Sequence, residues 1–248
     1  MLQIVREKRL LLKKTAIFYF IACSISWPFF WVRDRSPEIL TSATLKTLAQ
    51  FLMMWGPGIS ALFCFVIFRK THKRTITFQR RQLFLRGALF YITPFAIAAL
   101  INRDLHFFQY AALSFIYILG EELGWRGFLQ DALRPISTVK RFLIIGVLWE
   151  FWHFTTRTSI GTPFQILLRL CISYPCVILL AFILGVVTER FRSLWIPLAL
   201  HAFVDFVLMD SPEHAILIIP IALGIWAGML WLWPKYLDEL STSGIPKN

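Results

Sequence analysis

Two adjacent carboxylates stand in an otherwise apolar stretch of the chain, Glu121 and Glu122, followed by Arg126. Residues four apart share a face of an α-helix, so Glu122 and Arg126 can form an ion pair, whereas Glu121 is rotated by about 100°. Charged groups inside a bilayer cost several kcal/mol, so they are rare there and usually functional. The spacing therefore predicts one acid that is held ionised by arginine and a second acid that handles protons.

Two histidines and an aspartate occupy later apolar segments. His153 follows a run of aromatic residues, and His201 and Asp205 lie four apart on one predicted helix face. At about 1.5 Å per residue, Glu121, His153 and Asp205 lie roughly 16 to 18 Å from the predicted cytoplasmic ends of their helices, and His201 roughly 10 Å. The polar groups are thus predicted to meet at one level in the inner half of a membrane, which scattered structural residues need not do.

These residue types fit the hydrolysis of a peptide bond. Beside His153, Glu121 could take a proton from water and later give one to the leaving amine. His201 with Asp205 could polarise the scissile carbonyl or hold the oxyanion. Alternatively, Glu121, His153 and His201 could bind a divalent metal such as zinc and keep an open position for water. Whether a cofactor is needed stays open at this point.

Each group also has a structural interpretation. The glutamate–arginine pair could be a neutralised buried pair, and His153 could be an interior histidine that is hydrogen-bonded among aromatic rings. His201 and Asp205 could clamp two helices together. Glu150, three residues before His153, could orient that histidine or face another polar group. Because all of these groups are predicted at one depth in the membrane, a functional site is favoured over separate structural roles.

The elements that position these residues are predicted to be membrane-spanning helices. Hydrophobic residues make up 57% of the 248 residues and the mean hydropathy is +0.64, which is far more apolar than a soluble domain. A spanning helix needs about 20 apolar residues, and the apolar runs lack the alternation of outer-membrane strands. The sequence predicts an all-α polytopic membrane bundle of about eight transmembrane helices, at 15–32, 45–68, 84–101, 106–133, 141–156, 164–189, 194–209 and 214–233.

The formal charge of +12 is carried by short loops beside these apolar runs, where basic residues report topology. This placement argues against nucleic acid as a partner. With a cytoplasmic N-terminus, 19 of the 26 lysines and arginines fall on the inner side and six on the outer side, with Arg126 as the remaining one. The bias predicts that both termini face the cytoplasm, and the short loops favour a prokaryotic plasma membrane. We expect one integral membrane domain over 1–248, with its catalytic core helices at 106–209.

At these residues the sequence resembles the CPBP family of CAAX-processing and bacteriocin-processing intramembrane proteases, also called the Abi or type II CAAX endopeptidase family. The family pattern is E-E-x-x-x-R, then F-x-x-x-H, then H-x-x-x-N or H-x-x-x-D. Residues 121–126 match the first motif, and His153 matches the second, with Trp149 where phenylalanine is usual. Residues 201–205 match the third motif in its aspartate form, and Gly56-Pro57-Gly58 is also similar.

The resemblance implies an intramembrane endopeptidase that acts on a membrane-associated protein or peptide, with the lipid bilayer as surroundings. Trp149 and Glu150 depart from the pattern in ways that concern substrate specificity. Two other functions stay open: a non-catalytic membrane immunity or scaffold protein that retains the polar core, and a small proton-coupled transporter. By the resemblance, Glu121 and His153 would activate water, His201 and Asp205 would stabilise the transition state, and Glu122 and Arg126 would shape the site.

Overall fold

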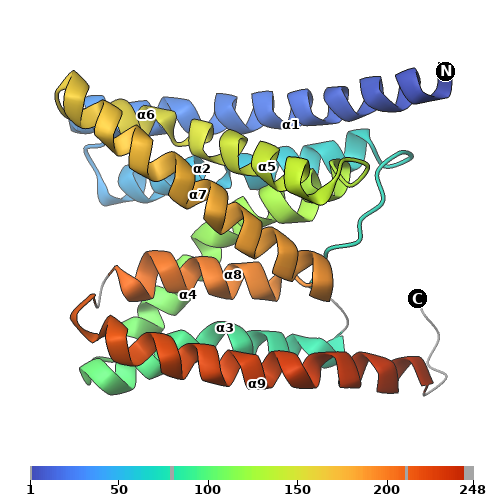
Figure 1. Ribbon diagram of the computed structural model, residues 1–248. Helices are drawn as coiled ribbons and strands as arrows, with labels where there is room; N and C mark the ends of the chain where they lie inside the picture. Colours follow the sequence, from blue (N-terminus) through green and yellow to red (C-terminus); the bar gives the residue numbers. More distant parts are fainter. Residues whose placement is uncertain (1, 79–80, 210–211, 243–248) are drawn as a thin grey trace. The chain divides into compact units, whose positions relative to one another are not determined.

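The structure is a computed structural model that describes residues 2–78, 81–209 and 212–242. The described residues contain helices and no β-strand, which confirms the all-α prediction. The α-helices are α1 (Leu2–Arg35), α2 (Ala43–Ile67), α3 (Arg81–Asn102), α4 (His106–Glu122), α5 (Thr138–Trp152), α6 (Phe154–Thr158), α7 (Pro163–Phe191), α8 (Trp195–Ala202) and α9 (Ala215–Thr242) (Figure 1). Short helices connect or extend them: the 3₁₀-helices η1 (Pro37–Ile39) and η4 (Pro212–His214) and the π-helices η2 (Leu123–Gln130) and η3 (Phe203–Leu208).

Five helical stretches of the described residues are long and apolar enough to cross a membrane, and a shorter apolar stretch covers Trp195–Leu208. The prediction of a helical protein with several membrane-spanning segments is therefore confirmed by the length and composition of its helices. The number of eight crossings and the cytoplasmic position of both termini stay predictions. The five stretches are Val5–Arg35, Ala43–Ile67, Leu83–Asn102, Pro163–Phe191 and Pro212–Trp233.

Four predicted segments differ from the structure. The first helix begins at Leu2 instead of residue 15, because the leucines, lysines and arginines before the apolar run are good helix formers. The segment predicted at 141–156 is interrupted at His153, between α5 and α6. The segments predicted at 106–133 and 194–209 both change from α-helix to π-helix part-way, at Leu123 and at Phe203.

The chain divides into two compact units. Unit 1 comprises Met1–Thr77 and Ile116–Val186, and unit 2 comprises Phe78–Phe115 and Val187–Asn248. Helices α4 and α7 each contribute residues to both units. Each unit is described below by itself.

In unit 1, α1 and α2 lie side by side (Figure 1). Two buried serines join them, because the hydroxyl of Ser26 donates to the carbonyl oxygen of Met53 at 2.7 Å and that of Ser60 donates to Phe18 at 2.6 Å. Small polar residues of this kind let spanning helices approach closely and satisfy their own hydroxyls.

The backbone of helix α2 is also in direct contact with the backbone of α4 and η2, next to the two acids. A Cβ added to Gly58 would lie 2.9 Å from the Cα of Gly120, and one added to Gly124 would lie 2.5 Å from Pro57. Real Cβ atoms essentially never come so close, so glycine is required at this crossing of α2 with α4 and η2. Gly120 directly precedes Glu121.

In unit 2, α3 and α9 lie side by side and α8 packs on α3 (Figure 1). The ring of Trp195 at the start of α8 occupies the place that a side chain at Gly87 would need, since an added Cβ would lie 2.2 Å from the ring. Trp226 of α9 donates its indole N–H to the carbonyl oxygen of Phe90 at 2.9 Å. These contacts hold α8, and hence His201, on α3.

The loop after α2 packs His72 against η2. Its ring stacks on Phe128, with centroids 4.6 Å apart and planes 25° apart. The pKa of His72 is lowered to about 4, chiefly by burial and then by the charge of Lys14; the carboxylate of Asp131 opposes this shift, and the charge of Arg74 adds to it less strongly. The folded protein therefore holds this imidazole neutral at a pH where the unfolded chain protonates it.

We expect the unfolding free energy to fall as the pH drops from about 6.5 to about 4, because in this window the unfolded state binds a proton at His72 that the folded state does not. His72→Phe keeps a ring against Phe128 and removes the titration. The thermal midpoint of His72→Phe should change less between pH 7 and pH 4.5 than that of the wild type. An equal acid shift in both proteins would contradict a role for this histidine.

Candidate active site

The ion pair expected from the first motif is present at the end of α4. Glu122 and Arg126 are fully buried, with 3.4 Å between Oε2 of Glu122 and Nε of Arg126. The guanidinium carbon also lies 4.5 Å from the centroid of the Trp149 ring. Among the described residues none of the three guanidinium nitrogens makes a hydrogen bond. Arg126 is thus held by the charge of Glu122 and by the ring face of Trp149.

The backbone widens directly after the two acids. Glu121 and Glu122 are the last residues of α4, and the π-helix η2 begins at Leu123. The α-helical geometry used to separate the acids therefore applies to Glu121 and Glu122, and the predicted pair of Glu122 with Arg126 forms although Arg126 lies in the π-helix. π-Helical turns are rare in proteins overall, and those that occur are often found at functional sites.

Glu121, the other acid of the motif, has a neutral hydrogen-bond partner in Trp149. The indole N–H donates to Oε2 of Glu121 at 2.8 Å, and both side chains are buried. The structure thus gives the adjacent acids different surroundings, with a guanidinium at Glu122 and an indole N–H at Glu121. This role of Trp149 was missed from the sequence, where the residue indicated only a change in volume. The signal was available, because indole carries an N–H that phenylalanine lacks.

His153 lies at the break between α5 and α6, and its backbone has φ −80° and ψ −2°. Its Nδ1 is 3.1 Å from the carbonyl oxygen of Trp149. Because a carbonyl oxygen only accepts, Nδ1 carries the hydrogen and Nε2 is the basic nitrogen of the neutral ring. Trp149 therefore contacts both Glu121 and His153, which brings the first two motifs together.

Glu150 faces polar groups other than the ring of His153. Its carboxylate is buried and accepts from Nε of Arg157 at 3.0 Å and from the hydroxyl of Ser173. Of the two interpretations of Glu150, the second is correct. The carboxylate joins α5, α6 and α7 around the break at His153.

Short helix α6 is anchored from α1 and α7 as well. Arg33 donates to the hydroxyl of Thr156 at 3.1 Å, and Arg35 donates to the carbonyl oxygen of Thr158 at 3.1 Å. Arg169 of α7 donates to the carbonyl oxygen of Arg157 at 2.8 Å. These contacts fix the segment that follows His153.

His201 and Asp205 form their expected pair in unit 2. Nε2 of His201 lies 3.3 Å from Oδ2 of Asp205, and the histidine is buried while the aspartate side chain is 38% exposed. The pair spans the change from α8 to the π-helix η3. A carboxylate at this distance can orient the imidazole.

The structure therefore gathers Glu121, Glu122, Arg126 and His153 around Trp149 in unit 1, and His201 with Asp205 in unit 2. Their meeting in one pocket stays a prediction. Within either unit, the described residues contain no group of three His, Cys, Asp or Glu side chains that could hold a metal ion. The predicted metal ligands Glu121, His153 and His201 come from both units.

Residues 103–207 match the family model for type II CAAX prenyl endopeptidase Rce1-like proteins. The chain carries an Rce1-like domain. This domain is consistent with the CPBP family and includes all three motifs, from the loop before α4 into η3. No curated protein and no solved structure matched the chain in the other two comparisons.

We expect Glu150→Ala to destabilise the Rce1-like domain, because it leaves Arg157 and Ser173 without their carboxylate. Removing one partner of a buried pair costs about 3 kcal/mol, and partial exposure of Arg157 reduces this to about 2 kcal/mol. Thermal unfolding in detergent would measure the loss, with the exposed Glu38→Ala as a matched control. A thermal midpoint equal to that of the control would contradict the anchoring role.

Proposed function

We propose that the chain is an intramembrane endopeptidase that hydrolyses a peptide bond in a membrane-associated protein or peptide, in CAAX-type or bacteriocin- and leader-type processing. The Rce1-like domain supports a CAAX-type protease family. The observation that carries the proposal is the hydrogen bond from Trp149 to Glu121 beside the Glu122–Arg126 pair. It gives Glu121 a neutral hydrogen-bond donor, whereas Glu122 lies 3.4 Å from the guanidinium of Arg126.

In this proposal Glu121 is the general base. Trp149 holds one carboxylate oxygen, and the other accepts a proton from water as the water oxygen attacks the scissile carbonyl carbon. The proton then passes to the amine nitrogen when the carbon–nitrogen bond breaks. Nε2 of His153 accepts a hydrogen bond from the same water, and His201, backed by Asp205, donates to the developing oxyanion.

A metal-dependent variant uses the same side chains. Glu121, His153 and His201 would hold the ion, which would polarise the water and the carbonyl. Nε2 of His153 suits this role because Nδ1 is taken by the Trp149 carbonyl. Loss of cleavage in chelator and its recovery with zinc would favour this variant over the glutamate-activated water.

We place the protein in a prokaryotic plasma membrane with both termini in the cytoplasm. Support comes from the 19 basic residues on the predicted inner side against six on the outer side. In unit 1, Lys14 of α1 binds Thr71 beyond α2, while Arg33 and Arg35 bind α6. Segments assigned to the same side are thus in contact.

We expect Glu121→Gln to lower kcat about 10³-fold, because the amide keeps the size of the side chain and cannot accept the proton. The measurement is cleavage of a membrane-anchored peptide by purified protein in lipid vesicles. Glu38→Gln, an exposed change of the same type, is the matched control for folding and reconstitution. Cleavage by Glu121→Gln at the rate of Glu38→Gln would remove Glu121 from the mechanism, and the scaffold alternative predicts an unchanged biological effect.

We expect Trp149→Phe to lower kcat about tenfold with little change in KM. It removes the N–H that fixes Glu121 and keeps an aromatic ring over Arg126, and a hydrogen bond to a charged group contributes about 1.5 kcal/mol. Steady-state kinetics beside a thermal unfolding curve would separate this loss from misfolding. Kinetics like those of the wild type would show that the indole N–H does not position the acid.

A further inference from the structure

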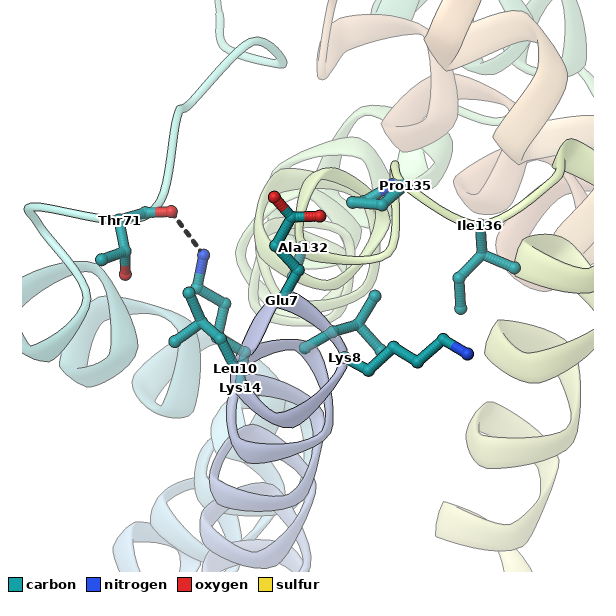
Figure 2. A pocket seen from close by; sticks show the side chains of 9 residues that line it. Glu7, Lys8, Leu10, Lys14, Thr71, Ala132, Pro135 and Ile136 are labelled. Carbon is teal, nitrogen blue, oxygen red and sulfur yellow. Dashed lines mark hydrogen bonds between the residues drawn. The ribbon is translucent and has the colours of Figure 1, made fainter. Parts of the chain in front are cut away.

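A pocket of about 390 Å³ opens in unit 1 where the first turns of α1 meet the loop after α2 and the segment after η2 (Figure 2). Its wall combines apolar side chains such as Leu10 and Ile136 with the ammonium groups of Lys8 and Lys14. None of the six predicted site residues lines it. Such a mixed lining suits a ligand that has a charged part and an apolar part.

Lys14 is the buried charge of this pocket. The residue is 7% exposed, and its ammonium donates to the carbonyl oxygen of Thr71 at 2.6 Å (Figure 2). No carboxylate lies within ion-pair distance of this ammonium among the residues that the structure describes. A buried ammonium has three N–H donors and is costly without a counter-ion, so this one is suited to an anion.

The pocket lies at the border between apolar helix and basic segments. Lys14 immediately precedes the apolar run that starts at Thr15, and Thr71 follows the end of α2 at Ile67 by four residues. This border is the level at which lipid headgroups meet a spanning helix. Further basic residues flank it on α1 and in the loop, namely Arg6, Arg9, Lys13, Arg69, Lys70 and Lys73.

The charge of the lining complements one negative charge. Figure 2 shows the ammonium of Lys14 pointing to Thr71, that of Lys8 extending on the side of Ile136, and the carboxylate of Glu7 on the side of Pro135. Two lysines against one glutamate leave a net charge of +1. A monoanionic phosphodiester matches this charge.

We propose that this pocket binds the headgroup of an anionic membrane phospholipid. Lys14 contacts the phosphate from the base of the pocket and Lys8 contacts it from the mouth. Leu10 and Ile136 contact the glycerol and the first carbons of an acyl chain. Basic pockets between spanning helices bind acidic headgroups in this way.

The test uses the purified full-length chain in neutral detergent, without a peptide substrate, so its outcome is independent of proteolysis. Short-chain phosphatidylglycerol, short-chain phosphatidylcholine and inorganic phosphate are each titrated, with bound molecules counted by native mass spectrometry and the thermal midpoint followed in parallel. We expect one phosphatidylglycerol per chain, bound at least tenfold more tightly than phosphatidylcholine, and no stabilisation by inorganic phosphate at matched concentration.

The variants locate the site. Lys14→Gln removes the charge and keeps an N–H donor on the side chain. We expect Lys14→Gln and Lys8→Gln each to weaken phosphatidylglycerol binding about fivefold, as one lysine near an anionic surface contributes. Lys13→Gln makes the same charge change on the neighbouring residue, which does not line the pocket, and should change binding less than twofold.

Three results would overturn the proposal. Equal weakening by Lys13→Gln would show diffuse surface charge, equal binding of phosphatidylcholine would show no selectivity for an anion, and equal stabilisation by inorganic phosphate would assign the pocket to a free anion. If Lys14→Gln fails to fold, Lys8→Gln decides, because the Lys8 side chain is exposed.

Discussion

The buried charge of Arg126 sets the arrangement of the polar interior of unit 1. A guanidinium away from water is costly unless other groups oppose its charge, and here Glu122 and the ring face of Trp149 do so. Satisfying the arginine brings α5 against the end of α4. The same indole then presents its N–H to Glu121. One tryptophan thus distinguishes two neighbouring acids, because its face serves the cation and its edge serves the second carboxylate.

Both four-residue polar pairs occur where an α-helix gives way to a π-helix. Glu122 stands immediately before η2, and His201 stands two residues before η3. A π-turn interrupts the regular α-helical order of backbone hydrogen bonds, and such turns are found frequently at functional sites. In each unit the pair lies across this change of helix type, with 3.4 Å between Glu122 and Arg126 and 3.3 Å between His201 and Asp205.

The local features could be predicted from the sequence and the distant contacts could not. The helices follow from continuous apolar runs, and the pairs Glu122–Arg126 and His201–Asp205 follow from the four-residue rule, which depends on one helix only. The bond from Trp149 to Glu121 joins residues 28 apart, and helical periodicity does not say which helix a face will meet. The break at His153 was also missed, because no glycine or proline marks it. It is held by Glu150 through contacts with two other helices.

The glycine contact between α2 and α4 has a consequence for how the protein responds to its membrane. Gly58 and Gly120 meet backbone to backbone, so neither helix can slip past the other by a side-chain rearrangement. Spanning helices usually tilt or shift when the hydrocarbon layer thickens or thins. Because Glu121 follows Gly120 directly, the position of this carboxylate along α2 should stay the same in a thick bilayer and in a thin one. A change in bilayer thickness should therefore alter the lipid around the two helices before it alters how α2 and α4 are aligned.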